Sequence, residues 1–373
     1  MRFNASKVSD IVGVVVFATL SVFLALWNNP TSPNSISKQK ASVVEVDNSQ
    51  INKLGVVVHG AQLLKVKILS GKFEGKIFRA ENNLRANMDL DKIFNVGDNI
   101  IVAISDDANP EKSQLIAQDF YRANYAGWLF LLFALLLILF AGWTGLKALL
   151  SFVFAGIFIW KVVVPLCLAG VNAILVCFCA VVALCFAIIF LVGGFSRKAL
   201  VAFLGSILGV SASCAMAIYF AKLFHINGGT MPFSQALFYS GYEFLRLSDL
   251  FVGGIFLSSS GAVMDLAMDV AAGQEEVFQN NKSISKTSLA ISGWKIGRSV
   301  VGTMTTTLLL AYSGGFLTLI MAFTAENVSL LDFISNPYVC TEVVKTIVGS
   351  FGLVLVAPFT AFVGGMIIAR NSE

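Results

Sequence analysis

Eight apolar stretches divide this chain, and each is long enough to cross a lipid bilayer as a helix. About twenty apolar residues span the hydrocarbon core, because a helix satisfies its backbone hydrogen bonds within its own segment. The pattern therefore predicts eight transmembrane helices, at residues 10–27, 126–143, 146–166, 168–191, 199–223, 250–271, 299–325 and 347–368.

Three of these stretches allow a second interpretation. The third and fourth could be one segment, but together they are too long for a single crossing, and Pro165 is expected to mark the turn between them. The first stretch follows Arg2 and Lys7, as a cleaved signal peptide would. No small-x-small cleavage pattern follows Trp27, so an uncleaved anchor over residues 1–27 is preferred.

A polar region separates the first two stretches and has the pattern of a small β-domain. Residues 28–40 are rich in Asn, Ser and Pro and predict a linker. Short β-branched runs then predict strands at 54–58, 63–69, 75–80 and 99–104. We expect residues 28–123 to form this linker and a β-barrel of the OB or SH3-like kind, a fold that by itself names no ligand.

Composition and charge agree with this division. The chain is 57% hydrophobic, with 32 Phe and only 13% charged residues, so lipid is part of its solvent. Basic residues lie mostly in short loops, which gives nucleic-acid binding little support. No catalytic, phosphate-binding or metal-ligand motif occurs, and the histidines His59 and His225 stand apart. We therefore expect neither enzymatic activity nor a cofactor or bound metal.

The basic residues of the short loops predict the orientation. Cytoplasmic loops of membrane proteins carry an excess of Lys and Arg. With both termini in the cytoplasm, ten such residues lie inside and four outside, and residues 28–123 lie outside. The inner set is Arg2, Lys7, Lys147, Arg197, Lys198, Lys282, Lys286, Lys295, Arg298 and Arg370, and the outer set is Lys161, Lys222, Arg246 and Lys345.

The sixth stretch contains two carboxylates, Asp265 and Asp269. An acidic side chain in hydrocarbon needs a partner, a proton or water. At 100° per residue, these aspartates share one helix face with small residues and with Glu276. Small residues let helices approach closely, so the stripe is expected to face protein through Gly254, Ser258 and Gly261.

The seventh stretch rises from the same side of the membrane. Lys295 and Arg298 precede it and are candidate charge partners for the aspartates. Gly302 is a further candidate for close helix packing, and Gly314 and Gly315 predict a break. The hydroxyls of this helix are candidates for a polar path, and they are Thr303, Thr305 and Thr306, followed by Thr307.

Two hypotheses for Asp265 stay open at this point. The first is a structural ion pair with Arg298 or Lys295. The second is a carboxylate that titrates or binds a cation in a transport path.

Three motifs follow one another along the chain: Gly261-Ala262-Val263-Met264-Asp265-Leu266-Ala267-Met268, then Gly297-Arg298 with Gly302-Thr303-Met304-Thr305, and near the end residues 349–355 and 358–361. In these motifs the sequence resembles the YibE/F family. The resemblance extends from about residue 55 and implies that residues 124–373 form a seven-helix membrane domain of this type. Against the family pattern, Asp269 replaces a serine, Lys295 an asparagine and Ser299 an aspartate.

The resemblance implies a multi-pass protein of the bacterial cytoplasmic membrane that is permease-like. We interpret the chain as a transport component coupled to a proton or ion through Asp265, with an unknown small solute or ion as its cargo. The alternative is a membrane scaffold or accessory protein whose outer domain binds a partner. Besides the lipid bilayer, a companion membrane protein or a second copy of the chain is a possible partner.

Overall fold

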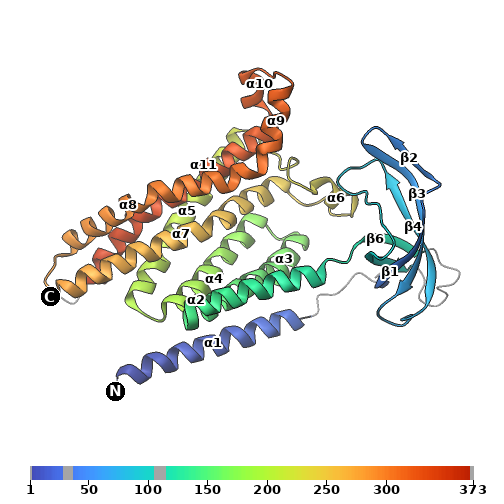
Figure 1. Cartoon of the computed structure of the whole chain (residues 1–373). Coiled ribbons are helices and arrows are strands. Elements are labelled where there is room, and N and C mark those ends of the chain that lie inside the picture. The colour runs from blue at the N-terminus through green and yellow to red at the C-terminus, as the bar shows by residue number, and fades with distance from the viewer. Residues whose placement is uncertain (1, 28–36, 105–114, 370–373) are drawn as a thin grey trace. The chain divides into compact units, whose positions relative to one another are not determined.

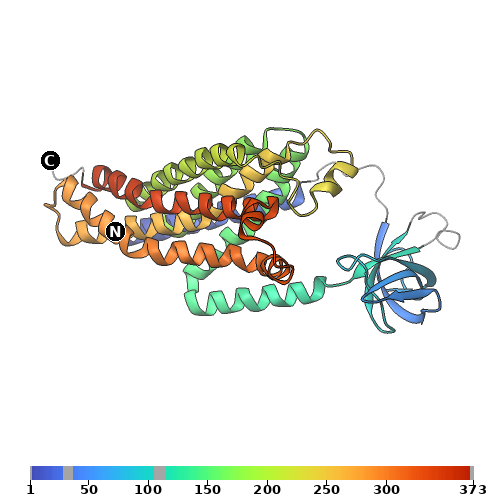
Figure 2. The ribbon, with the colours of Figure 1, turned by 90° about the horizontal axis from the view of Figure 1, so that it is seen from above.

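The computed structural model describes residues 2–27, 37–104 and 115–369. It forms two compact units (Figures 1 and 2). One comprises Pro30–Leu136 and contains the β-domain, and the other comprises Met1–Asn29 with Leu137–Glu373 and contains most of the helices. Residues 28–36 of the predicted linker, and Arg370, lie outside the described residues.

The β-domain is a small barrel. β1 pairs with both β3 and β5, and β6 lies between β5 and β4, so five strands close into a ring. β4 and β6 are parallel, whereas the other pairs are antiparallel. This order is that of a five-stranded Greek-key barrel of the OB type. The strands are β1 Ser37–Asp47, β2 Ile51–Leu54, β3 Val57–Ile68, β4 Ile77–Arg85, β5 Asn99–Ile104 and β6 Leu115–Phe120.

The barrel corrects the predicted strands in three places. β1 begins at Ser37, inside the segment assigned to the linker, and pairs with two strands despite its polar composition. β6 was not predicted at all. Residues 54–58 contain the turn between β2 and β3, where Gly55 has a φ of 61°. Alternation explains β1, because its inward residues Ala41 and Val43 are buried while its lysines point outward.

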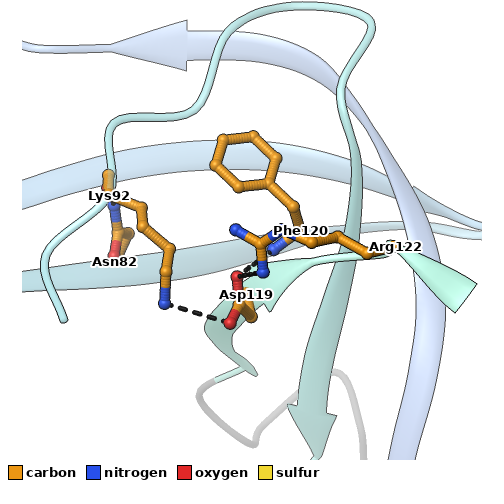
Figure 3. Close-up of polar contacts among 5 residues, drawn as sticks. All are labelled: Asn82, Lys92, Asp119, Phe120 and Arg122. Carbon is orange, nitrogen blue, oxygen red and sulfur yellow. Dashed lines mark hydrogen bonds and ion pairs between the residues drawn. The ribbon is translucent and has the colours of Figure 1, made fainter. Parts of the chain in front are cut away.

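Two polar groups fasten the segment after β4 to the barrel. Gln62 is fully buried, and its amide exchanges hydrogen bonds with the backbone of Phe94. Asn82 donates to the carbonyl oxygen of Lys92 at 2.6 Å. Lys92 thereby comes within 3.0 Å of Asp119 on β6, which also pairs with Arg122 at 2.7 Å (Figure 3).

These contacts set the ionisation of Asp119. Burial by itself raises the pKa of the Asp119 carboxyl, but hydrogen bonds from Lys92, the Phe120 backbone N–H and Arg122 outweigh it. The pKa of Asp119 therefore lies below its ordinary value.

The second unit is a bundle of long helices. α5, α7, α8 and α11 pack side by side, and α4 packs against α5 and α7 (Figure 1). The helices are α1 Arg2–Leu26, α2 Ala123–Phe158, α3 Val164–Leu168, α4 Ala173–Gly193, α5 Arg197–Leu223, α6 Ser234–Tyr239, α7 Leu247–Asn280, α8 Lys286–Ser313, α9 Leu317–Ala325, α10 Leu330–Ser335 and α11 Pro337–Ile367.

Among the described residues, six helical segments are long and apolar enough to cross a membrane. The count differs from eight at two places. The apolar run Ile11–Leu26 of α1 is shorter, and Ala123–Leu168 counts as one segment of 46 residues. The predicted break after α8 is confirmed, because a short 3-10 helix, Gly314–Phe316, separates α8 from α9.

The segment Ala123–Leu168 is bent sharply at Gly142, which has non-helical angles of φ 54° and ψ −127°. A methyl group on Gly145 would overlap the backbone of Leu137, a contact that a straight helix cannot make between residues eight apart. The chain thus reverses at Gly142. The predicted turn between the third and fourth stretches is present but lies just after Pro165: a π-helix, Ile159–Val163, precedes Pro165, the helix continues to Leu168, and α4 begins at Ala173.

Small residues bring the central helices together. A methyl group on Gly209 would lie 2.9 Å from Val356 Cβ, and one on Gly297 would lie 2.6 Å from Ala357 Cβ. α5 and α8 therefore approach α11 at positions where no larger side chain fits. α7 packs against α5, α8 and α11 as well, and α7 and α8 carry the predicted site residues.

Candidate functional site

α7 has two different faces. One is buried in the bundle, with Val263, Leu266, Ala267 and Val270 fully enclosed. The other is exposed, and the whole predicted stripe lies on it: Gly254, Ser258, Gly261, Asp265, Asp269 and Glu276.

The expected close packing through the glycines of this stripe is not seen among the described residues, because a methyl group on Gly254, Gly261 or Gly302 would have no neighbour within 4 Å. Other glycines of α7 pack closely instead: Gly253 lies against Cys177 of α4, and Gly273 lies against Ile296 of α8. Neighbouring residues on a helix point 100° apart, and the sequence alone does not show which of the faces that carry small residues is buried.

The aspartates and the cations are not paired in the part of the chain that the structure describes. Within residues 2–27, 37–104 and 115–369, neither Asp265 nor Asp269 has an ion pair or side-chain hydrogen bond, and neither has Lys295 or Arg298. Arg298 lies on the side of α8 that faces α11. There it lines a groove of about 370 Å³ with Trp294, Val301 and Pro358.

Helix geometry explains this separation. Ile296 is one of the residues of α8 that touch α7, since its Cδ1 would lie 2.7 Å from a methyl group on Gly273. Arg298 is two residues further and hence roughly 200° around the helix. Arg298 therefore lies on the side of α8 that points away from α7, the helix that carries Asp265 and Asp269.

Two carboxylates exposed on a membrane helix are energetically unfavourable. An aspartate at the centre of a membrane span costs about 2.5–3.5 kcal/mol. Asp265 lies inside the apolar run of α7, residues 250–271, and Asp269 lies near the end of that run. The charge must therefore be neutralised, hydrated or covered.

The threonines make bonds within their own helix. Thr303 donates to Val300 O at 2.9 Å, Thr305 to Val301 O at 2.7 Å and Thr306 to Gly302 O at 3.1 Å. Each hydroxyl oxygen keeps its acceptor capacity. Thr303 and Thr306 are exposed, so these oxygens are accessible from outside the bundle.

A second polar cluster, which was not predicted, joins three helices near the predicted outer side. Ser258 on α7 and Tyr312 on α8 share a hydrogen bond of 2.9 Å. Lys345 on α11 lies 5.2 Å from the centre of the Tyr312 ring and 3.4 Å from Glu342. The spacing of Glu342 and Lys345 at the start of an apolar run was the available signal.

A third feature missed at the sequence level is Gln274. Its side chain is fully buried, and its amide donates to Leu289 O at 3.1 Å and to Ala361 O at 2.9 Å. Gly293 and Gly364 lie directly against it. Gln274 thereby fastens α7 to α8 and α11. A glutamine beside two acids in the sequence gave no sign of this burial.

The described residues contain no group of three His, Cys, Asp or Glu side chains that could hold a metal ion. The cysteines Cys167, Cys177 and Cys185 are buried, whereas Cys179 is exposed. Cys340 lies in α11.

These observations define a class: a multi-pass α-helical membrane protein with a small β-barrel domain between its first two helices. The YibE/F-like protein family matches residues 129–370, and the YibE/F family N-terminal domain matches residues 35–118. The chain belongs to the YibE/F family. No curated protein and no solved structure matches it.

Proposed function

We propose that this protein is a permease or transport component of the bacterial cytoplasmic membrane and that Asp265 couples transport to a proton or cation. The observation that carries the proposal is a carboxylate near the middle of α7 that has no ion pair in the described part of the chain. Such a group can gain and lose a proton as its surroundings change. The exposed hydroxyls of Thr303 and Thr306 on α8 are acceptors for a proton or ion path.

The proposal includes eight membrane crossings. The long segment Ala123–Leu168 reverses at Gly142, and each half is long enough to cross. Counting it twice and adding α1 to the six candidate segments gives eight. With ten basic residues inside against four, both termini lie in the cytoplasm and residues 28–123 lie outside. Reporter fusions after residue 100 and after Glu373 test this topology, which fails if both report the same compartment.

The test of coupling uses purified protein in liposomes that contain a pH-sensitive dye. Gradients of sodium, potassium, amino acids or phosphate are imposed, and proton movement is recorded. We expect Asp265→Asn to abolish the coupled movement and Asp265→Glu to retain part of it. Glu276→Gln is the matched control, because Glu276 shares the stripe but lies near the end of α7.

The coupling hypothesis is refuted if the wild-type protein moves no protons under any of these gradients and cells carrying Asp265→Asn keep the wild-type phenotype. No catalytic step is part of the proposal.

A second candidate function rests on the barrel. The turn between β2 and β3 exposes two apolar side chains, Leu54 at 73% and Val56 at 83%. Exposed apolar residues at the tip of a hairpin suit the binding of a partner. In this alternative the membrane helices are a scaffold. It predicts that Leu54→Ser with Val56→Ser abolishes function while Asp265→Asn does not, and that crosslinking recovers a stoichiometric partner.

A further inference from the structure

We infer that the exposed face of α7 and α8 binds a second copy of this chain in the same membrane, with the acids of each α7 against the cations of the partner copy. The inference concerns assembly and does not depend on the transport proposal. Its starting point is a face that is unsuited to lipid. α7 presents Gly254, Ser258, Gly261, Asp265 and Asp269, and α8 presents Ser299, Gly302, Thr303 and Thr306.

The apolar runs of α1 and α2 carry no cation that could neutralise this face. The first half of α2 has no charged residue between Arg122 and Lys147, and α1 has none between Asp10 and Trp27, since its Arg2 and Lys7 precede that run. A cover formed by either apolar run would leave both carboxylates unpaired. An occupant that pairs with these acids brings its own positive charge to the face.

The chain carries a positive charge on α8 at the depth of Asp269. Gly297 packs against Val270, since a methyl group on it would lie 3.4 Å from Val270 Cγ2. Arg298, the next residue, is thus level with Asp269. Lys295 and Arg298 are both exposed. A two-fold axis perpendicular to the membrane keeps every residue at its depth, so Asp269 of one copy is level with Arg298 of the other.

The arrangement of the helices fits such an axis. α8 packs against both α7 and α11, which also pack against each other, and its remaining side is exposed. With the axis beside α8, each α7 comes opposite the groove between α8 and α11 of the other copy. Arg298 lines that groove. The placement that separates acid from cation within one chain therefore brings them together between two chains.

The residues at the axis permit a close crossing. Gly302 and Thr306 are one turn apart on the exposed side of α8, and Gly302 has no neighbour within 4 Å. Small residues at this spacing let two membrane helices approach and pack. The dimer thus has an α8–α8 contact at its centre and an acid–cation contact on each side.

Charge reversal in two versions of the chain tests the pairing. The first carries Asp265→Lys and Asp269→Lys, and the second carries Lys295→Glu and Arg298→Glu. Association in liposomes is measured by energy transfer between donor-labelled and acceptor-labelled chains. We expect wild type to associate, each variant alone to associate about tenfold or more weakly, and the two mixed variants to regain association. In the mixed pair, both acid–cation contacts are restored between chains.

Two results would overturn the inference. One is a wild-type chain that stays monomeric at every protein-to-lipid ratio, which would mean that another molecule covers the face. The other is a pair of variants that each fold but do not associate when mixed.

A second measurement remains decisive if the charge variants do not fold. Gly302→Cys introduces a small residue where nothing in the chain is close, so folding is preserved. Oxidation should join residue 302 of two copies, above the baseline set by the six native cysteines of wild type. Absence of this crosslink in membranes refutes the proposed axis.

Discussion

We expect substitution of Gly364 on α11 to destabilise the helical bundle, because Gly364 lies directly against the side chain of Gln274. A methyl group on Gly364 would lie 2.7 Å from Gln274 Cδ and 3.0 Å from Gln274 Nε2, closer than packed atoms approach. Gln274 is fully buried, so its amide must move and give up its bonds to Leu289 O and Ala361 O. At about 0.5–1.5 kcal/mol for each bond, Gly364→Ala should lower the free energy of unfolding by about 1–3 kcal/mol.

Removal of the glutamine side chain should cancel this cost. In a Gln274→Ala background, the atoms that the new methyl group would meet are absent. Gly364→Ala should then change stability by less than about 0.5 kcal/mol, apart from a small gain in helix propensity. The two substitutions therefore have a coupling energy of about 1–3 kcal/mol in a double-mutant cycle.

The assay is SDS-driven unfolding of the purified chain in detergent micelles, followed by tryptophan fluorescence. Gly156→Ala is the matched control, because Gly156 is also helical but has no neighbour within 4 Å. It should be neutral or slightly stabilising. Additive effects of Gln274→Ala and Gly364→Ala would refute the reasoning, since they would show that Gln274 does not fill the space beside Gly364.

Two further predictions concern the barrel and the reversal in α2. Asp119→Asn should lower the stability of isolated residues 30–122 at pH 7 by up to about 1 kcal/mol, because the ion pairs are partly exposed. The lowered pKa of Asp119 means that its contribution is present above the ordinary value of 3.8 and is lost as pH falls through the folded-state value. Denaturation at pH 7 and at pH 2 should show that the stability difference between wild type and Asp119→Asn is smaller at pH 2. Asp89→Asn is the control, because Asp89 has no ion pair among the described residues, and it should not lower stability at pH 7. Gly142→Ala should destabilise the membrane unit by about 1–3 kcal/mol in the SDS assay, because a side chain is strained at φ 54° and ψ −127°, whereas Gly127→Ala should not.

Much of the membrane architecture could be read from hydropathy alone. Apolar runs located α4, α5, α7, α8 and α11 because a helix in lipid must satisfy its own backbone, a requirement that depends on length and composition. The ends were less certain. α7 continues to Asn280, well past the apolar run that predicted it, because a helix does not end where its side chains become polar.

The barrel was predicted only in part. β5 followed from its β-branched run and the turn before it. β1 and β6 could not be recognised, since each is stabilised by pairing with strands distant in the sequence. A polar strand such as β1 becomes a strand through those partners.

The candidate site could also be predicted only in part, because its surroundings depend on helices distant in the sequence. The sequence by itself determined that Asp265 and Asp269 share a helix face with small residues, because the helical repeat is a local property. Only the tertiary structure decided that this face points out of the bundle and that Arg298 lies on the far side of α8. Several faces of α7 carry small residues that allow close packing, and the choice among them depends on how Gly253, Gln274 and Gly297 fit their neighbours on three other helices.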